Sequence, residues 1–340
     1  MLFTRHKKER KVMKIETKQE ILEVLRMPFE EYRHTVMAEA ARIHREENGN
    51  ILTATAMLGY DNICKNQCLY CGMRAGNSAV KRYRLDQEEV IRWIGVAQAK
   101  GFGRLFLVSG EDPKYGFDHL LAIVHAAKHA GMHVSLACGE FSLEQYRELK
   151  NAGADEYVMK FEMSDREDFD RLNPSTSFEK RIKNIGYIKQ CGLKLASGNI
   201  VGYPGHNDSK AADDILLMKE LEISWAPVIP YMPALNTPLA KEGGPGSIET
   251  NLKEISILRI MMHSLDITAQ QPGRNLAQGL ASTEGNLEAL KAGANMLFAD
   301  MLPDAMAKNF SVVDNRSGMG MAHLEEMAKL SGMELKLRAN

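Results

Sequence analysis

The stretch DQEEVIRWIGVAQAKGFGRLFLVS, residues 86–109, contains the unit that decides the fold. Its first half begins with a capping signal at Asp86 and Glu89 and continues with the three-to-four spacing of a helix that buries one face. Gly101 then supplies the residue that most often ends a helix in a left-handed conformation. The apolar run that follows suits a strand buried on both faces, so the unit predicts a helix, a turn and a buried strand.

The same unit recurs along the chain, with a glycine between the helix pattern and the next apolar run at Gly101, Gly131, Gly153, Gly192 and Gly293. The runs predicted as strands are 51–57, 104–109, 132–137, 156–163, 193–201, 225–230, 265–269 and 295–299. Strands that alternate with helices in this way predict an α/β fold, a parallel (β/α)8 barrel of the TIM type. A doubly wound open sheet is the competing architecture.

The segments outside the barrel are also readable. Residues 17–50 are predicted to form two helices before the first strand, 51–302 the barrel, and 303–340 a C-terminal cap with a short helix near 323–330. We therefore expect a single domain over residues 17–340. Residues 1–16 are basic and lack an apolar stretch, which predicts a disordered tail and argues against a secretory signal.

Composition excludes several classes of protein. The chain is 44% hydrophobic and 26% charged, with a formal net charge of −1. This balance gives no indication of nucleic acid or a membrane surface as partner. No apolar run reaches the length of a membrane span. The five cysteines are an odd number, and three of them lie within eight residues. This pattern argues against disulfides and predicts a reducing, cytoplasmic location with metal or redox use of the thiolates.

Cys64, Cys68 and Cys71 follow the first strand with the spacing C-x3-C-x2-C, and the aromatic Tyr70 precedes the last of them. Three thiolates on one loop can bind three irons of a [4Fe-4S] cluster and leave the fourth iron without a protein ligand. That iron can chelate the amino and carboxylate groups of S-adenosylmethionine. One electron then cleaves the cosubstrate into methionine and a 5′-deoxyadenosyl radical.

Other interpretations of the triad stay open at this point. A zinc site would need a fourth ligand, for which His133 or His206 is available. The three thiols could also be buried and inert. A third alternative is a non-catalytic iron–sulfur protein, a scaffold or an electron carrier.

If the barrel prediction holds, functional side chains should lie just past the C-terminal ends of the strands. Candidates for binding the cosubstrate are Tyr70, Gly110, Glu111, Asp112, Glu162, Arg181, Gly202 and Tyr231. Candidates for contacting the substrate are Cys138, Glu140, Lys160, Thr268, Gln270 and Arg274. Each of them taken alone could be a structural or solvated residue, but their convergence on one face favours a ligand site.

Several of these residues are candidates for a specific chemical reason. Glu111 can receive an ammonium group, and Arg181 can grip a carboxylate with two hydrogen bonds. Lys160 and Glu162 share one face of their strand, so they either pair with each other or divide the polar ends of a ligand. Gly202 permits the close approach of a ring or of backbone.

The triad with Tyr70 resembles the signature of the radical S-adenosylmethionine (SAM) superfamily. Further motifs look like the branch that holds the FeFe-hydrogenase maturase HydE, methylornithine synthase (PylB) and biotin synthase. These motifs occupy residues 81–84, 109–113, 173–181, 202–205 and 236–239. The resemblance covers roughly residues 25–300.

The resemblance implies a complete barrel around a buried cavity, a [4Fe-4S] cluster and SAM as cofactors. Residues 110–113 would bind the methionyl amino group, Glu162 the ribose and Arg181 the methionyl carboxylate, and Tyr231 would lie near the adenine. A small amino-acid-derived substrate and a low-potential electron donor such as flavodoxin or ferredoxin are implied as partners.

The sequence also departs from the pattern. Biotin synthase needs a second cluster with further cysteines inside the barrel, and only Cys138 is placed for that role. Lys160 stands where the maturase has arginine. The tail looks more like methylornithine synthase, yet the aspartate that holds its substrate has no counterpart in residues 268–274. A maturase-like enzyme acting on a cysteine-bound iron complex is the leading hypothesis, and a lysine mutase like methylornithine synthase is its rival.

Overall fold

The structure, a computed structural model, describes residues 13–314 and 318–338. Most of the predicted basic tail, residues 1–12, therefore lies outside the described part of the chain. Within that part, no helix is both long and apolar enough to cross a membrane.

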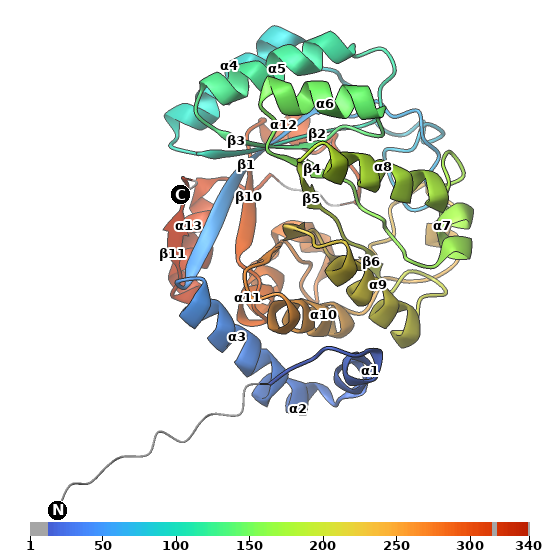
Figure 1. Cartoon of the computed structure of the whole chain (residues 1–340), viewed down its shortest axis with the longest axis vertical. Coiled ribbons are helices and arrows are strands. Elements are labelled where there is room, and N and C mark those ends of the chain that lie inside the picture. The colour runs from blue at the N-terminus through green and yellow to red at the C-terminus, as the bar shows by residue number, and fades with distance from the viewer. Residues whose placement is uncertain (1–12, 315–317, 339–340) are drawn as a thin grey trace, which may run out of the picture.

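A ring of parallel strands forms the centre of the molecule (Figure 1). In the order in which they pair, the strands are β10 (Met296–Asp300), β1 (Ile51–Asp61), β2 (Arg104–Ser109), β3 (His133–Ala137), β4 (Glu156–Val158), β5 (Lys194–Ala196), β7 (Trp225–Ala226) and β9 (Asp266–Ile267). A parallel bridge between Thr268 and Met296 joins the two ends of this order. The barrel prediction is confirmed, and the open sheet is not the fold.

Two predicted strands are divided in the structure. The run at 193–201 becomes β5 and β6 (Ile200–Val201), and the run at 225–230 becomes β7 and β8 (Ile229–Pro230). β6 and β8 pair with each other in a separate two-stranded sheet. Pro227 interrupts the second run because proline has no N–H to donate to a neighbouring strand. The run at 156–163 also ends early, and its last residues turn toward the cavity described below.

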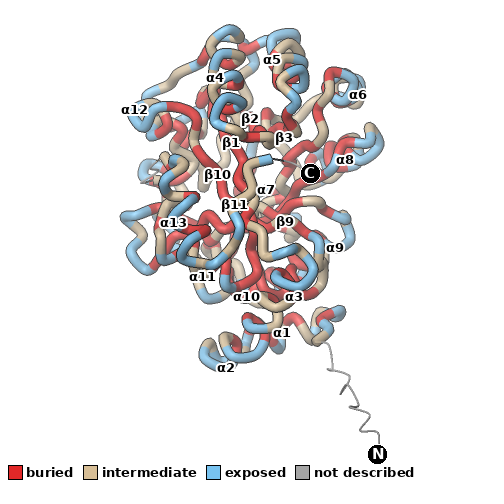
Figure 2. The backbone as a smooth tube through the Cα atoms, turned by 90° about the vertical axis from the view of Figure 1, so that its left-hand side faces the viewer, coloured by how far each residue is buried: buried red, intermediate tan, exposed pale blue. Residues whose placement is uncertain are grey.

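Helices surround the barrel, and the buried parts of the chain lie inside them (Figure 2). The helices between strands are α4 (Gln87–Ala99), α5 (Phe117–His129), α6 (Leu143–Ala152), α7 (Arg166–Leu172), α8 (Phe178–Gln190), α9 (Asp208–Glu220), α10 (Ile248–Met261) and α11 (Thr283–Lys291), with short 3-10 turns η1 (Leu239–Lys241) and η2 (Leu276–Ala281). The predicted cap is present at α4, where the Asp86 side chain accepts from the Glu89 N–H at 2.8 Å.

At both ends of the chain, the number of helices and strands differs from the number predicted from the sequence. Three helices, not two, precede the barrel: α1 (Lys18–Arg26), α2 (Phe29–His34) and α3 (Val36–Glu47). After α12 (Asp304–Ala307) and α13 (Met321–Ser331), an unpredicted strand, β11 (Glu334–Lys336), pairs with the start of β1. A three-residue strand is too short to show a periodicity in the sequence, so only the pairing reveals it.

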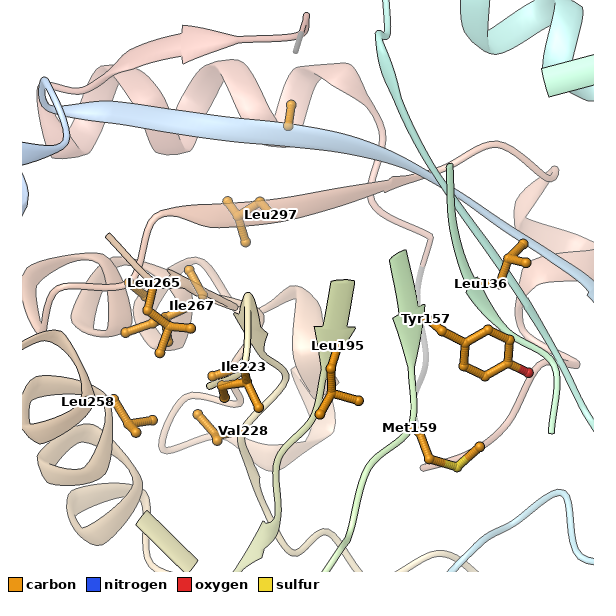
Figure 3. Packing of buried hydrophobic residues seen from close by; sticks show 14 of the residues in the cluster. Leu136, Tyr157, Met159, Leu195, Ile223, Val228, Leu258, Leu265, Ile267 and Leu297 are labelled. Atoms are coloured by element: carbon orange, nitrogen blue, oxygen red, sulfur yellow. The ribbon is translucent and has the colours of Figure 1, made fainter. Parts of the chain in front are cut away.

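The core has two layers. The outer layer fills the space between strands and helices, where Leu258 of α10 faces Ile223 and Val228 (Figure 3). The inner layer fills the barrel itself and includes Phe106, Trp225 and Phe298, whose ring centroids lie 5.2 to 5.5 Å apart. These rings come from three strands across the barrel, so they close its interior halfway along the strands.

Candidate functional site

A cavity of about 390 Å³ occupies the C-terminal half of the barrel above these rings. The sequence-predicted residues that line it are Cys64, Tyr70, Gly110, Glu111, Lys160, Glu162, Arg181, Tyr231, Thr268 and Gln270. The rest of the lining is largely apolar. A polar mouth above an apolar floor is the arrangement of a small-molecule site at the active face of a barrel.

The cysteine loop follows β1 directly and is fixed from several sides. The Lys65 N–H donates to the Glu111 carbonyl at 3.0 Å, and the Gly72 N–H donates to the Val312 carbonyl at 3.0 Å. The Arg82 guanidinium donates to the carbonyl oxygens of Asn62 and Met73, each at 2.7 Å. Segments distant in sequence therefore hold the three cysteines in place over the cavity.

The thiols themselves lie in a poorly hydrated setting. Burial raises the pKa of the Cys64 and Cys71 thiols, and it raises the pKa of Cys68 to about 12. Cys64 contributes to the raised pKa of Cys68, and Cys68 and Cys64 both contribute to the raised pKa of Cys71. Burial thus favours the protonated thiols. A bound cationic metal centre would favour the thiolates instead, because coordination deprotonates a thiol.

Among the described residues, no group of three or more His, Cys, Asp or Glu side chains could hold a single metal ion, so the triad suits a cluster in which each thiolate binds a separate iron. The other two cysteines are held elsewhere: Tyr60 donates to Cys138 at 3.2 Å, and Cys191 lies 3.6 Å from the Leu143 carbonyl. Neither histidine of the zinc alternative lies at the triad. His133 begins β3, at the opposite end of the barrel, and His206 Nε2 lies 3.3 Å from Asp214.

The loop after β2 lies against the cysteine loop. The Gly110 N–H donates to the Asp61 carbonyl at 2.9 Å. A Cβ atom at Gly110 would lie 2.1 Å from the Ile63 carbonyl oxygen, so only glycine permits this approach. Glu111 faces the cavity, with its carboxylate 3.2 Å from Lys65 Nζ. Asp112 does not line the cavity and accepts from Arg84 Nε at 2.5 Å.

Lys160 and Glu162 reach the cavity together, with Nζ 3.0 Å from Oε2. Glu162 has a φ of 63°, a left-handed conformation that costs free energy in a residue other than glycine. Two backbone hydrogen bonds hold it there, to the Gly198 carbonyl at 3.0 Å and from the Ile200 N–H at 2.9 Å. Of the two alternatives left open by the sequence, the structure shows the pairing.

Arg181 is buried at the cavity wall and has a fixed orientation. Its Nε donates to Glu140 at 3.0 Å, and its guanidinium carbon lies 5.3 Å from the centre of the Phe169 ring. Glu140, expected to contact substrate, is therefore placed beside Arg181 and Lys180 and not in the cavity. Arg181 Nη1 also donates to the Lys160 carbonyl oxygen, so the guanidinium is oriented from two sides at the cavity wall.

Two tyrosines, Tyr70 and Tyr231, form part of the cavity wall. The Tyr70 hydroxyl donates to Asn173 at 2.7 Å. The Tyr231 hydroxyl is buried and has no hydrogen-bond partner among the described residues. A buried hydroxyl without a partner costs free energy, which a bound ligand would recover.

Three further candidates lie outside the cavity. Gly202 donates its N–H to His206 Nδ1 at 3.0 Å and packs against Gly246, so it shapes the wall from behind. Cys138 lies in a separate pocket of about 280 Å³ on the other side of Glu111. Arg274 is exposed on the surface, 3.5 Å from Glu284. The placement of Arg274 does not support its predicted contact with substrate.

A buried polar network behind Glu162 was missed by the sequence analysis. Asp214 of α9 accepts from the Ser164 N–H at 2.8 Å, from Asn199 Nδ2 at 2.9 Å and from His206. Glu254 of α10 is fully buried beside it, and burial raises the pKa of its carboxyl group well above the ordinary value. The signal that could have found both is a carboxylate within an otherwise apolar helix face.

Comparisons with known proteins agree on the family. The radical SAM superfamily pattern matches residues 61–218. The chain is 32% identical over 287 residues to the [FeFe] hydrogenase maturase subunit HydE of Thermotoga maritima, covering 84% of this chain and 81% of HydE. It is 24% identical over 316 residues to 3-methylornithine synthase of Methanosarcina acetivorans, covering 88% of this chain and 87% of that enzyme.

Solved structures show the same fold. The crystal structure of methylornithine synthase (PylB) superposes with a TM-score of 0.82 and 22% identity, covering 94% of both chains. The maturase HydG superposes with a TM-score of 0.79 and 19% identity, covering 95% of this chain and 72% of HydG. The cysteine loop lies beside the barrel cavity, and the chain is 32% identical to the maturase HydE over most of both chains. The chain is therefore an enzyme that belongs to the radical SAM superfamily.

Proposed function

We propose that Cys64, Cys68 and Cys71 hold a [4Fe-4S] cluster at which SAM is cleaved reductively, and that the resulting 5′-deoxyadenosyl radical acts on a small amino-acid-derived substrate. The observation that carries this proposal is the triad itself. Cys64 lines the barrel cavity, Cys68 and Cys71 follow on the same loop, and the two remaining cysteines are held elsewhere. A cluster with only three protein ligands keeps one iron open for the cosubstrate.

The surrounding residues supply binding and orientation. We expect Gly110 and Glu111, which line the cavity, to receive the methionyl amino group, and Arg181, held by Glu140, to receive the carboxylate. Glu162 would accept hydrogen bonds from the ribose hydroxyls, and Tyr231, whose hydroxyl has no partner among the described residues, would contact the adenosine. The apolar floor keeps water from the reacting atoms, as radical chemistry requires.

The substrate is best described as maturase-like. The chain and HydE are 32% identical, and this supports a cysteine-bound metal complex as the substrate class. The deep part of the cavity, where Thr268 and Gln270 lie, offers no unpaired charge among the described residues. Lysine carries an ε-ammonium group besides its α-ammonium and carboxylate groups, and this extra charge would need a buried partner there, which argues against the mutase alternative. Biotin synthesis is not supported either, because Cys138 lies outside the cavity.

Other aspects stay predictions: a cytoplasmic location, a small-molecule substrate, and flavodoxin or ferredoxin as electron donor. Neither nucleic acid nor a membrane is expected to be a partner.

The proposal is tested with protein reconstituted anaerobically with iron and sulfide. With dithionite and SAM, the wild-type protein should form methionine and 5′-deoxyadenosine. The Cys68→Ala variant should lose both the iron–sulfur absorbance and all cleavage, because two thiolates cannot retain the cluster. Cys191→Ala, at the end of α8 and far from the triad, is the matched control and should retain both. Absence of SAM cleavage by a wild-type protein with a full complement of iron would contradict the proposal.

The two substrate classes are separated in the same assay. A cysteine-bound iron carbonyl complex and lysine are added in turn, and the rate of 5′-deoxyadenosine formation is compared. Faster formation with lysine would favour the mutase alternative, and faster formation with the complex the maturase-like one.

A further inference from the structure

A second pocket lies on the far side of Glu111 from the barrel cavity. It has a volume of about 280 Å³ and is bounded by the first residues of α5 and α6, two helices that lie side by side (Figure 1). Ser109, Gly110 and Glu111 line both this pocket and the cavity. The two spaces therefore share the loop after β2 as a common wall, and we call the second space the side pocket.

Glu111 carries the charge of this common wall. Gly139, which lines the cavity, has a φ of 100°, and a Cβ atom there would lie 2.1 Å from Glu111 Cγ. Glycine at this position thus leaves room for the Glu111 side chain. Among the described residues, the ion-pair partner of Glu111 is Lys65, with Nζ at 3.2 Å, and the Lys65 side chain is 54% exposed. An ion pair with such exposure is weak, so both charges remain available to a ligand.

The other two carboxylates of the side pocket are held more firmly. Asp112 accepts from Arg84 Nε at 2.5 Å, and Glu140 accepts from Arg181 Nε at 3.0 Å. Each of them is therefore bound to an arginine. Glu111 is the carboxylate of the pocket that a ligand ammonium group can reach at the smallest cost.

The floor of the side pocket combines two tyrosines with Cys138. The Tyr60 hydroxyl donates to Cys138 Sγ at 3.2 Å, and the Tyr60 and Tyr115 ring centroids lie 4.9 Å apart. Tyr115 is 9% exposed, and its hydroxyl is buried without a hydrogen-bond partner among the described residues. A buried hydroxyl of this kind costs free energy, which a ligand atom that accepts its hydrogen bond would recover.

The side walls are aromatic. The Phe117 and Phe141 ring centroids lie 5.4 Å apart, so four aromatic rings line the side pocket together with Tyr60 and Tyr115. A thioether sulfur makes favourable contacts with aromatic rings and accepts a weak hydrogen bond. The floor and walls thus suit an uncharged side chain that contains sulfur, whereas the rim offers one negative and one positive charge.

We propose that the side pocket binds free methionine, an α-amino acid with a thioether side chain. Its ammonium group pairs with Glu111 and its carboxylate with Lys65, while its sulfur accepts a hydrogen bond from the Tyr115 hydroxyl. The inference rests on the proposed function for the source of the ligand, because SAM cleavage releases methionine on the cavity side of Glu111. No bond forms or breaks in this binding step.

Glu111 can serve the two spaces at once. An ionised carboxylate has two oxygens and accepts several hydrogen bonds, so it can bind the cosubstrate on one side and free methionine on the other. The side pocket would therefore hold the product away from the cluster while the next SAM molecule enters the cavity.

The test measures binding of radiolabelled L-methionine to the full-length, anaerobically reconstituted protein by equilibrium dialysis. The protein is saturated with SAM and kept free of reductant, so that the cavity is filled and no SAM is cleaved. The wild-type protein should bind one methionine per chain. Norleucine, in which a methylene group replaces the sulfur, should compete about fivefold more weakly than methionine, because it cannot accept the Tyr115 hydrogen bond.

Two variants locate the site. Tyr115→Phe should weaken methionine binding about fivefold and remove the preference for methionine over norleucine. Lys65→Gln should weaken the binding of both amino acids to the same extent, because both carry the carboxylate. The matched control is Tyr187→Phe on α8, where the ring packs against Lys183, and it should bind both amino acids as the wild type does.

The outcomes separate this proposal from the proposed function. Absence of bound methionine in the SAM-saturated wild-type protein would overturn it, and so would an unchanged preference for methionine in Tyr115→Phe. Tyr115 does not line the cavity, so this variant should still cleave SAM at the normal rate when dithionite is added. Failure of the proposed function gives a different result: methionine binds as described, but no 5′-deoxyadenosine forms.

Discussion

At the scale of single residues, the site depends on a strained glutamate and on the carboxylate behind it. Glu162 keeps its left-handed backbone because the next strand end, at Gly198 and Ile200, pairs with it. The Asp214 carboxylate accepts hydrogen bonds from Ser164, which lies two residues after Glu162, and from Asn199, which lies between Gly198 and Ile200. The orientation of a cavity residue is thus fixed by a helix carboxylate that does not itself line the cavity.

Replacing this carboxylate should weaken SAM binding more than turnover. In Asp214→Asn, an NH2 group faces donors, so the support of Glu162 loosens. We expect the KM for SAM to rise about tenfold, which corresponds to about 1.4 kcal/mol, with kcat changed less than threefold. The measurement is 5′-deoxyadenosine formation at a series of SAM concentrations. Asp213→Asn, which removes only a surface ion pair with Lys18, is the control. A normal KM in a folded Asp214→Asn protein would refute this role.

At the scale of elements, the helices before the barrel are tied to its N-terminal end. α3 packs against α10, and the buried His44 of α3 lies near Arg259 of α10. Arg259 is itself fully buried and donates to the Gly293 carbonyl at 2.8 Å. Burial, with a smaller contribution from Arg259, lowers the pKa of His44 to about 4 from its ordinary value of 6.5.

This shift predicts acid sensitivity. Between pH 6.5 and about 4 the unfolded chain binds a proton at His44 that the folded protein does not, so stability falls as the pH falls through this window. The loss attributable to His44 is about 2 kcal/mol at pH 5. His44→Leu should therefore lose less stability between pH 7.5 and pH 5 than the wild type, measured by urea unfolding. The exposed His34 provides the control variant His34→Leu, which should behave as the wild type.

At the scale of the whole molecule, the barrel is closed by its interior as well as by its strands. Phe106, Trp225 and Phe298 meet inside it, and Trp225 Nε1 donates to Thr268 Oγ1 at 2.7 Å, beside the bridge that closes the ring. The same aromatic rings form the floor of the cavity. Stability and the depth of the site therefore depend on the same residues.

Trp225→Ala should destabilise the protein by about 3–5 kcal/mol, since it leaves a large hole and removes the partner of Thr268. The chain has two tryptophans, and Trp93 of α4 is only partly buried, so Trp93→Ala should cost clearly less. Urea unfolding followed by circular dichroism measures both. Equal losses in the two variants would show that the inner layer does not close the barrel.

The sequence by itself determined the barrel and the cysteine triad. Both are local patterns: a helix, a glycine and an apolar run repeat along the chain, and the three thiols lie within eight residues. Such patterns can be recognised in the sequence because they depend only on residues that are close together along the chain. Even so, the short β11 and the third N-terminal helix escaped, since elements of this length carry too little periodicity.

Only the tertiary structure decided which polar residues face the cavity. Gln270 lines it while Arg274, four positions later, lies on the surface, and Glu140 turns aside to Arg181, 41 residues away. Asp214 reaches Ser164 across 50 residues, a contact that no local pattern announces. Past the end of a strand, the direction of a side chain depends on loop geometry and on partners distant in sequence, and these exist only once the barrel has closed.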